Sequence, residues 1–261
     1  MKIATWNING IKARLPALLK WLETFQPDVL CLQEIKSVDV GFPREPIEDL
    51  GYNIALHGQK SFNGVAILSK TLLSDVCVGL AGDETDTQAR YLEATVATDG
   101  SPIRVASIYL PNGNPVSTDK YPYKLAWMDR LIAHAETLLA DELPVLLAGD
   151  YNVIPEPEDC YSPTAWQEDA LFQPASRDAL KTLQYLGFAD AIRSCFAAPQ
   201  MYTFWDYQAG AWQKNNGIRI DHILLSPQAT DRLRESGIEK ATRSWEKPSD
   251  HVPVWVEISD A

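Results

Sequence analysis

The stretch Val145-Leu146-Leu147-Ala148-Gly149-Asp150-Tyr151-Asn152 passes from an apolar run into polar residues. Buried strands read as apolar runs of about four to eight residues, and at their ends a rigid sheet gives way to loops. Residues two apart on an extended chain point to the same side, so Asp150 and Asn152 can contact one ligand together. A carboxylate that orients water and an amide that binds an oxygen suit attack at phosphorus. Taken alone, the motif is explained equally well by an Asx turn.

Five other segments repeat this pattern along the chain. They are residues 3–6 before Asn7, 29–33 before Glu34, 105–108 before Tyr109 and Asn112, 219–220 before Asp221, and 248–249 before Asp250 and His251. Acids, amides and one histidine at so many strand ends predict a single polar site at the rim of a sheet. Such a set suits a hard divalent cation and phosphate chemistry.

The rest of the chain predicts a mixed architecture in one domain, 1–261. Apolar residues at steps of three and four indicate helices over 11–25 and 127–138, and a third candidate spans 176–186. Strand-like runs occupy 2–8, 28–33, 64–69, 91–98, 103–109, 144–149, 220–225 and 252–258, and Asp99-Gly100 is a hairpin signal. Strands joined by helices and by hairpins predict an α/β or α+β sandwich. A doubly wound nucleotide fold is disfavoured, because no Gly-rich turn follows the first strand.

Composition is that of a soluble globular protein, with 46% hydrophobic and 22% charged residues. No stretch approaches about 18 apolar residues, so we expect no membrane partner. The chain enters a strand at Lys2, which leaves no room for a signal peptide, and its four cysteines are scattered. These features predict a cytoplasmic protein.

The net charge of −12 argues against a nucleic-acid partner, because phosphate binding normally leaves a basic footprint. This criterion is weak here. Acidic residues can lie on a distant face, and a metal site needs carboxylates while the metal contributes positive charge of its own.

The adjacent pair Asp250-His251 suggests a dyad, but neighbouring residues on a strand point to opposite faces. We therefore predict that His251 pairs with Asp221 at another strand end, and that Asp250 lies near the metal or its water. Glu34 ends a strand expected to be buried on both faces, so its charge needs a partner or a metal unless it is simply exposed.

Six motifs together resemble the exonuclease III type of apurinic/apyrimidinic (AP) endonucleases. The two longest are Pro27-Asp28-Val29-Leu30-Cys31-Leu32-Gln33-Glu34-Ile35-Lys36 and Asn215-Asn216-Gly217-Ile218-Arg219-Ile220-Asp221-His222-Ile223-Leu224-Leu225-Ser226. The others are Trp6-Asn7-Ile8-Asn9-Gly10, Tyr109-Leu110-Pro111-Asn112, Gly149-Asp150-Tyr151-Asn152 and Ser249-Asp250-His251. They follow in the family's order, and the resemblance covers nearly the whole chain.

This resemblance implies a four-layer αββα sandwich, with two mixed β-sheets face to face and helices outside. It also implies hydrolysis of DNA phosphodiesters with Mg²⁺, for which Mn²⁺ can substitute. By the same resemblance the metal region comprises Glu34, Asn7, Asp150, Asn152 and Asp250. The catalytic residues are Asp150 for the attacking water, Asn152 and Tyr109 for the scissile phosphate, and His251 with Asp221 for the same phosphate.

The predicted DNA contacts are Asn112, Lys36, Arg90, Phe204, Trp205 and Arg219. Phe204 and Trp205, with Ile218 and Ile220, would line a pocket for a flipped-out abasic sugar, although core packing explains these aromatics equally well. The segment 107–112 lacks the second catalytic histidine of many relatives, which favours the abasic-site and exonuclease branch. The segment Asp190-Ala191-Ile192-Arg193 departs from the family's pattern at its two middle residues.

The leading hypothesis is therefore a Mg²⁺-dependent DNA repair phosphodiesterase, monomeric and acting on double-stranded DNA with abasic sites or 3′ ends. It would release 5′-mononucleotides as a 3′-to-5′ exonuclease, cut 5′ to abasic sites and remove 3′-phosphate blocks. One alternative is a phosphoesterase of the same fold that acts on a small phosphorylated metabolite or lipid head group. A non-catalytic DNA-binding relative is disfavoured, because every expected catalytic position is filled.

Overall fold

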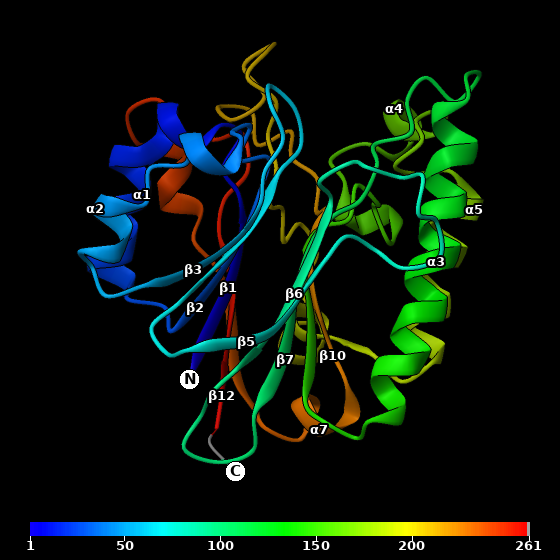
Figure 1. The fold of residues 1–261 in the computed structure, drawn as a ribbon. Coiled ribbons are helices and arrows are strands. Elements are labelled where there is room, and N and C mark those ends of the chain that lie inside the picture. Colours follow the sequence, from blue (N-terminus) through cyan, green and yellow to red (C-terminus); the bar gives the residue numbers. More distant parts are fainter. Residues whose placement is uncertain (260–261) are drawn as a thin grey trace.

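Two six-stranded sheets pack face to face in the computed structural model, which describes residues 1–259 (Figure 1). The first has the order β11-β12-β1-β2-β4-β3, with β1 (Lys2–Asn7), β2 (Val29–Gln33), β3 (Asn53–His57), β4 (Val65–Ser69), β11 (Leu233–Ile238) and β12 (Val254–Ile258). The second has the order β5-β6-β7-β8-β10-β9, with β5 (Leu73–Val78), β6 (Tyr91–Val96), β7 (Ile103–Tyr109), β8 (Val145–Asp150), β9 (Ala189–Asp190) and β10 (Asp221–Leu225). Both sheets are mixed, because β1–β2 and β7–β8 pair in parallel and the other pairs are antiparallel.

Helices cover the two outer faces. α1 (Ile11–Phe25) and α2 (Glu45–Glu48) lie outside the first sheet, and α3 (Lys120–Ala140) and α5 (Pro174–Tyr185) lie outside the second (Figure 1). The shorter helices are α4 (Pro163–Trp166), α6 (Ala191–Cys195) and α7 (Pro227–Thr230), with 3-10 turns η1 (Asp39–Gly41), η2 (Pro157–Asp159) and η3 (Lys240–Ser244). The predicted four-layer sandwich is confirmed. No helix within residues 1–259 is long and apolar enough to cross a membrane.

Three apolar clusters hold these layers together. Between the sheets, side chains such as Val29 and Val65 meet Val105 and Leu146 from the opposite sheet. Outside the first sheet Trp21 of α1 packs on β1 and β2, and outside the second sheet Trp127 of α3 packs on β7 and β8. Alternating inward and outward side chains on each strand give both faces an apolar contact, which accounts for the nearly unbroken apolar runs of the central strands.

All eight predicted strands and the three predicted helices are present. α3 begins at Lys120, several residues before the predicted start. The four strands that the sequence did not predict are β3, β5, β9 and β11, which are the four edge strands of the two sheets. Edge strands are partly exposed, as in β5, and so they lack continuous apolar runs.

One rim of the sandwich collects the ends of the central strands. β1, β2, β7 and β8 all finish there, while the antiparallel β10 begins there instead of ending. The register places Tyr109 opposite Asp150, and Asp150 opposite Asp221. The polar residues predicted at strand ends therefore meet in space.

Candidate active site

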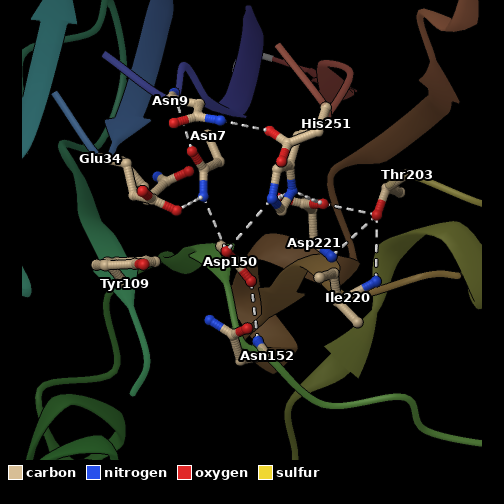
Figure 2. A network of polar contacts seen from close by, with 12 residues as sticks. Asn7, Asn9, Glu34, Tyr109, Asp150, Asn152, Thr203, Ile220, Asp221 and His251 are labelled. Atoms are coloured by element: carbon tan, nitrogen blue, oxygen red, sulfur yellow. Dashed lines mark hydrogen bonds and ion pairs between the residues drawn. The ribbon is translucent and has the colours of Figure 1, made fainter. Parts of the chain in front are cut away.

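A network of polar side chains from six segments occupies this rim (Figure 2). Asn7, Tyr109 and Asp150 are the last residues of β1, β7 and β8, and Asp221 is the first residue of β10. Glu34 directly follows β2 and has a φ of +49°, so the chain turns there and the side chain leaves the plane of the strand. Anchoring on six segments of a rigid sandwich fixes the relative positions of these groups.

Two carboxylates and an imidazole form the centre of the network. Ligand atoms of Glu34, Asp150 and His251 all lie within 4.8 Å of one another. The Asn7 amide Nδ2 donates to Glu34 Oε1 and to Asp150 Oδ2, both at 2.9 Å, and so holds the two carboxylates side by side. Carboxylate oxygens in such a group are ligands preferred by hard divalent cations, and the donor set therefore fits Mg²⁺ or Mn²⁺.

His251 is held from behind by a second carboxylate. Its Nδ1 lies 2.9 Å from Asp221 Oδ2, and its Nε2 lies 3.8 Å from Asp150 Oδ2. Asp221 also accepts a 2.6 Å hydrogen bond from the Thr203 hydroxyl. The pairing of His251 with Asp221 is thus present, as the strand geometry predicted, and it directs Nε2 toward Asp150 (Figure 2).

Burial and crowding of charges shift the proton affinities of this group. Burial raises the pKa of Asp150; His251 lowers it and Asp221 raises it again, and the result is above the usual range. Burial alone would lower the pKa of His251, but Asp221 and Asp150 outweigh that effect and raise it. The imidazole therefore keeps both protons at neutral pH. Its Nε2–H is a charged donor, while the excess of carboxylates favours binding of a cation or a proton.

Two asparagine amides lie beside this centre. Asn152 accepts at Oδ1 from Asn112 Nδ2 at 3.1 Å and donates from Nδ2 to the Leu110 carbonyl at 2.9 Å. Its backbone N–H donates to Asp150 Oδ1 at 2.9 Å, which is an Asx-type turn. Each amide nitrogen has one further hydrogen to offer, so the pair can donate to an anion. The Asx turn is thus present, and it leaves the Asn152 amide a hydrogen for a ligand.

This chain matches known proteins over nearly its whole length. Residues 4–251 match the endonuclease/exonuclease/phosphatase family. The chain belongs to this family.

Three known proteins are similar to this chain from end to end. Exodeoxyribonuclease III of Haemophilus influenzae is 35% identical, over 99% of this chain and all of that protein. An AP endonuclease from Archaeoglobus fulgidus is 36% identical, covers 99% of both chains and has a TM-score of 0.94. The 3′ phosphatase NExo from Neisseria, solved with a product DNA hairpin, is 35% identical, covers 99% of both chains and also has a TM-score of 0.94. The predicted resemblance to the exonuclease III type is confirmed.

Several other residues for which the sequence predicted a role border the site. Tyr109 lies at the rim near Glu34 and Asp150 (Figure 2), and burial, followed by the charges of these two acids, raises the pKa of its phenol. The Arg90 guanidinium stacks 4.8 Å from the centre of the Tyr109 ring. Lys36 binds Glu34 Oε2 at 2.7 Å. These contacts place two cations beside the carboxylates.

Phe204 is half-buried and meets His251 edge to face, with 4.9 Å between ring centres. It lines a cavity of about 280 Å³ together with Ile218, Tyr161 and Trp166. An aromatic wall next to the imidazole agrees with the predicted pocket. Ile220 does not line this cavity, although it belongs with Ile218 to the buried cluster on which Phe204 packs.

Two predicted DNA contacts are wrong for this structure. Trp205 is completely buried and donates from its indole to Asn215 Oδ1 at 3.1 Å. Arg219 is 1% exposed, and its guanidinium binds Asp159 Oδ1 at 2.7 Å and Asp190 Oδ2 at 2.6 Å. Both side chains are buried in the interior, where the indole is hydrogen-bonded and the guanidinium is fully paired. Neither can contact DNA.

Asp250 lies farther from the centre than predicted, outside the group formed by Glu34, Asp150 and His251. It accepts from Asn9 Nδ2 at 3.0 Å, and Asn9 in turn accepts from Lys36. Asn9 and Thr203 are further polar neighbours of the site, and the sequence assigned a role to neither. Asn9 follows Asn7 by two residues, and that spacing was the available signal for a shared face.

Proposed function

We propose that this protein is a Mg²⁺-dependent DNA repair nuclease of the exonuclease III type. It removes nucleotides from 3′ ends as 5′-mononucleotides, cuts the backbone 5′ to abasic sites and removes 3′-phosphate blocks. The observation that carries the proposal is the convergence of Glu34, Asp150 and His251 within 4.8 Å at a rim where two asparagine amides also offer hydrogens. One phosphate site of this kind serves all three reactions.

Each side chain has a separate task in the proposed hydrolysis. Glu34 and Asp150, with Asn7 and more distantly Asp250, would hold the divalent cation; when bound, it neutralises charge on the phosphoryl oxygens. Asp150 orients the attacking water and accepts its proton. The protonated His251 donates from Nε2 to a non-bridging oxygen, and Asp221 keeps it charged and oriented.

Asn152 and Tyr109 complete the phosphate site in this scheme. The amide of Asn152 and the phenol of Tyr109 are neutral donors at the rim, and both stay neutral at physiological pH. Donors fixed before the reaction stabilise charge on the phosphoryl oxygens without reorganising. The scissile phosphate is thus approached from three strand ends: by Tyr109 of β7, by Asp150 and Asn152 of β8, and by His251 before β12.

The DNA partner is supported by local charge and by the relatives. Lys36, Arg90 and Asn112 lie on the same rim as the carboxylates, so DNA meets positive charge there despite the overall net charge of −12. Relatives similar over their whole length are named as exonuclease, AP endonuclease and 3′ phosphatase. The use of Mg²⁺ or Mn²⁺, a monomeric state and a cytoplasmic location remain predictions from the sequence.

A single substrate tests this proposal. A synthetic duplex with one abasic analogue is incubated with the protein, with Mg²⁺ or with chelator, and the products are examined for a 3′-hydroxyl 5′ to the lesion. We expect cleavage with Mg²⁺ only, and a loss of about 10²- to 10⁴-fold in Asp150→Asn. Asp99→Asn, at the exposed β6–β7 hairpin on the opposite end of the sheet, is the matched control and should cleave normally.

The alternative of a small phosphorylated substrate, which the net charge of −12 suggested, is not favoured, because the relatives are DNA repair nucleases. That alternative predicts Mg²⁺-dependent release of phosphate from a sugar phosphate or lipid head group, with the abasic duplex and recessed 3′ ends left intact. Cleavage of the duplex without turnover of the small compounds would exclude it.

A further inference from the structure

Lys124 is a charged residue whose side chain is entirely buried. It lies in the first turns of α3 and is 0% exposed. A buried ammonium group is costly unless it is paired and hydrogen-bonded. Burial lowers its pKa to about 7, while the charges of Asp150 and Asp169 act in the opposite direction. None of the functions assigned above uses this lysine, so its burial needs a reason.

The ammonium group binds two backbone carbonyls of the phosphate site. Lys124 Nζ donates to Asn152 O at 2.5 Å and to Asn112 O at 3.1 Å. These residues follow β8 and β7, which are parallel neighbours in the second sheet. Their side-chain amides also touch, with 3.1 Å between Asn112 Nδ2 and Asn152 Oδ1. Lys124 therefore joins, through the backbone, the two turns that present these amides.

The local chain is built around the lysine stem. Gly113 has a φ of +92°, and a Cβ there would lie 2.7 Å from Lys124 Cδ, so only glycine lets this turn pass over the side chain. Asn152 has a φ of +47°, a conformation that non-glycine residues rarely adopt. A charged donor to the Asn152 carbonyl stabilises that conformation.

The Asn112 amide is fixed in one orientation. Its Oδ1 accepts from the Asn114 backbone N–H at 3.2 Å and from Asn114 Nδ2 at 2.9 Å. Asn114 is held in turn by Asp169 at 2.9 Å. With Oδ1 occupied in this way, Nδ2 of Asn112 points to Asn152. Both amides therefore depend on the path of the turn that Lys124 binds.

We propose that Lys124 is a positioning residue of the phosphate site. Its ammonium group holds the carbonyls of Asn112 and Asn152 so that both side-chain amides address one phosphate group. This inference rests on the proposed function, because it assigns a role within that phosphate site.

Steady-state kinetics on the abasic duplex test the role. Lys124→Met keeps the volume and removes the charge and donors. Misplaced phosphate donors slow the chemical step, whereas many other contacts hold the DNA; we expect kcat to fall about 10- to 100-fold and KM to change less than about threefold. Lys124→Arg retains charge and donors and should recover at least part of kcat.

Arg130→Met is the matched control, since Arg130 is on the same helix and its guanidinium is paired with Asp86 away from the asparagines. It should keep kcat within about threefold even if it lowers Tm as much as Lys124→Met does. The proposal is overturned if Lys124→Met retains kcat within that range. It is equally overturned if the Met and Arg variants lose kcat and Tm in parallel, which would mark a purely structural lysine. Should Lys124→Met not fold, Lys124→Gln and Lys124→Arg are compared in its place by the same criteria.

A crystal structure of Lys124→Met separates this inference from the proposed function. We expect the hydrogen bond between the Asn112 and Asn152 amides to be lost. If wild-type protein fails to cut DNA, the proposed function fails, and this structure alone decides the positioning role. Amides that keep their mutual hydrogen bond without the lysine would disprove it.

Discussion

Two clusters of acids differ in how their charge is balanced. At the rim, Glu34, Asp150 and Asp221 face two cations, the imidazole of His251 and the ammonium group of Lys36. Behind it, Asp159 and Asp190 are bound by Arg219, and Asp159 also by Arg193. The first cluster has more carboxylates than cations, whereas the second is paired one to one.

The same burial has opposite outcomes in the two clusters. Burial raises the pKa of Asp159 and of Asp190, but Arg219 outweighs it and both pKa values are lowered. Asp150 has no such partner, and its pKa is raised. A buried acid with a guanidinium partner is therefore a structural ion pair, while one without is ready to take a proton or a metal.

The largest expected effect comes from His251→Asn, which removes the charged donor at the rim. Removing one such donor typically lowers kcat by about 10²- to 10³-fold, and we expect a loss in that range on the abasic duplex. The variant should also lose stability, because Asp150 and Asp221 stay buried without the cation between them, so kcat is compared per folded protein. His134→Asn, whose imidazole binds Glu93 beneath α3 and away from the rim, is the control and should keep full nuclease activity. Near-normal activity of His251→Asn would refute the proposed phosphate role.

Arg219→Met should lower the stability of the fold without lowering the activity of the folded protein. It leaves Asp159 and Asp190 buried without their cation, and breaking such a pair costs about 3–5 kcal/mol of unfolding free energy, measurable by urea denaturation. The folded fraction should keep its activity. The exposed Arg234→Met is the control, with a change of about 0.5 kcal/mol or less. A stable but inactive Arg219→Met variant would instead support the DNA contact that the sequence predicted for Arg219.

The sequence predicted the rim correctly because strand ends are visible in it. Central strands are buried on both faces, so their apolar runs and the polar residues that follow stand out. β5 and β11 were missed because edge strands face solvent and mix polar with apolar residues. Asp221 was expected at the end of a strand but opens one, and a run of apolar residues does not reveal strand direction.

Side-chain burial beyond the rim was the part that the sequence could not predict. Arg219 is two residues from Asp221. Its guanidinium binds Asp159, which is 60 residues away in the chain, and no local sequence pattern indicates this contact. Lys124 occupies a polar position of its helix and is buried only because the turn at Gly113 passes over it. Such contacts arise from tertiary packing, and no periodicity in the sequence indicates them.

A third cluster extends the comparison to a pH-dependent test. Glu93 is buried beneath α3, where it binds Arg104, His134 and Tyr91. Burial alone would raise its pKa, but hydrogen bonds from these three partners outweigh it and lower the pKa to about 2. A depressed carboxyl pKa stabilises the fold above the unfolded-state value and loses that effect as pH falls toward the folded-state value.

Glu93→Gln should therefore cost roughly 2 kcal/mol of unfolding free energy at pH 7, since one pKa unit corresponds to about 1.4 kcal/mol and the cluster shares its charge. The difference from wild type should shrink as pH falls from about 4.5 toward 2. Urea denaturation at pH 7 and at pH 3 measures it. A difference that is the same at both pH values would mean that the charge of Glu93 contributes nothing.

The smallest expected effect is the change in Tm on adding Mg²⁺. It tests the excess of carboxylates at the rim without DNA. A cation that binds only the folded protein stabilises it by about 1.4 kcal/mol at ten times its Kd, which is about 3–5 °C in Tm for a chain of this size. We expect Mg²⁺ to raise the Tm of wild type by this amount and of Glu34→Gln hardly at all. Glu158→Gln, in the acidic segment near the balanced cluster, should respond like wild type. An equal Mg²⁺ response in all three proteins would mean that the cation binds away from Glu34 and that the excess of carboxylates at the rim does not attract it.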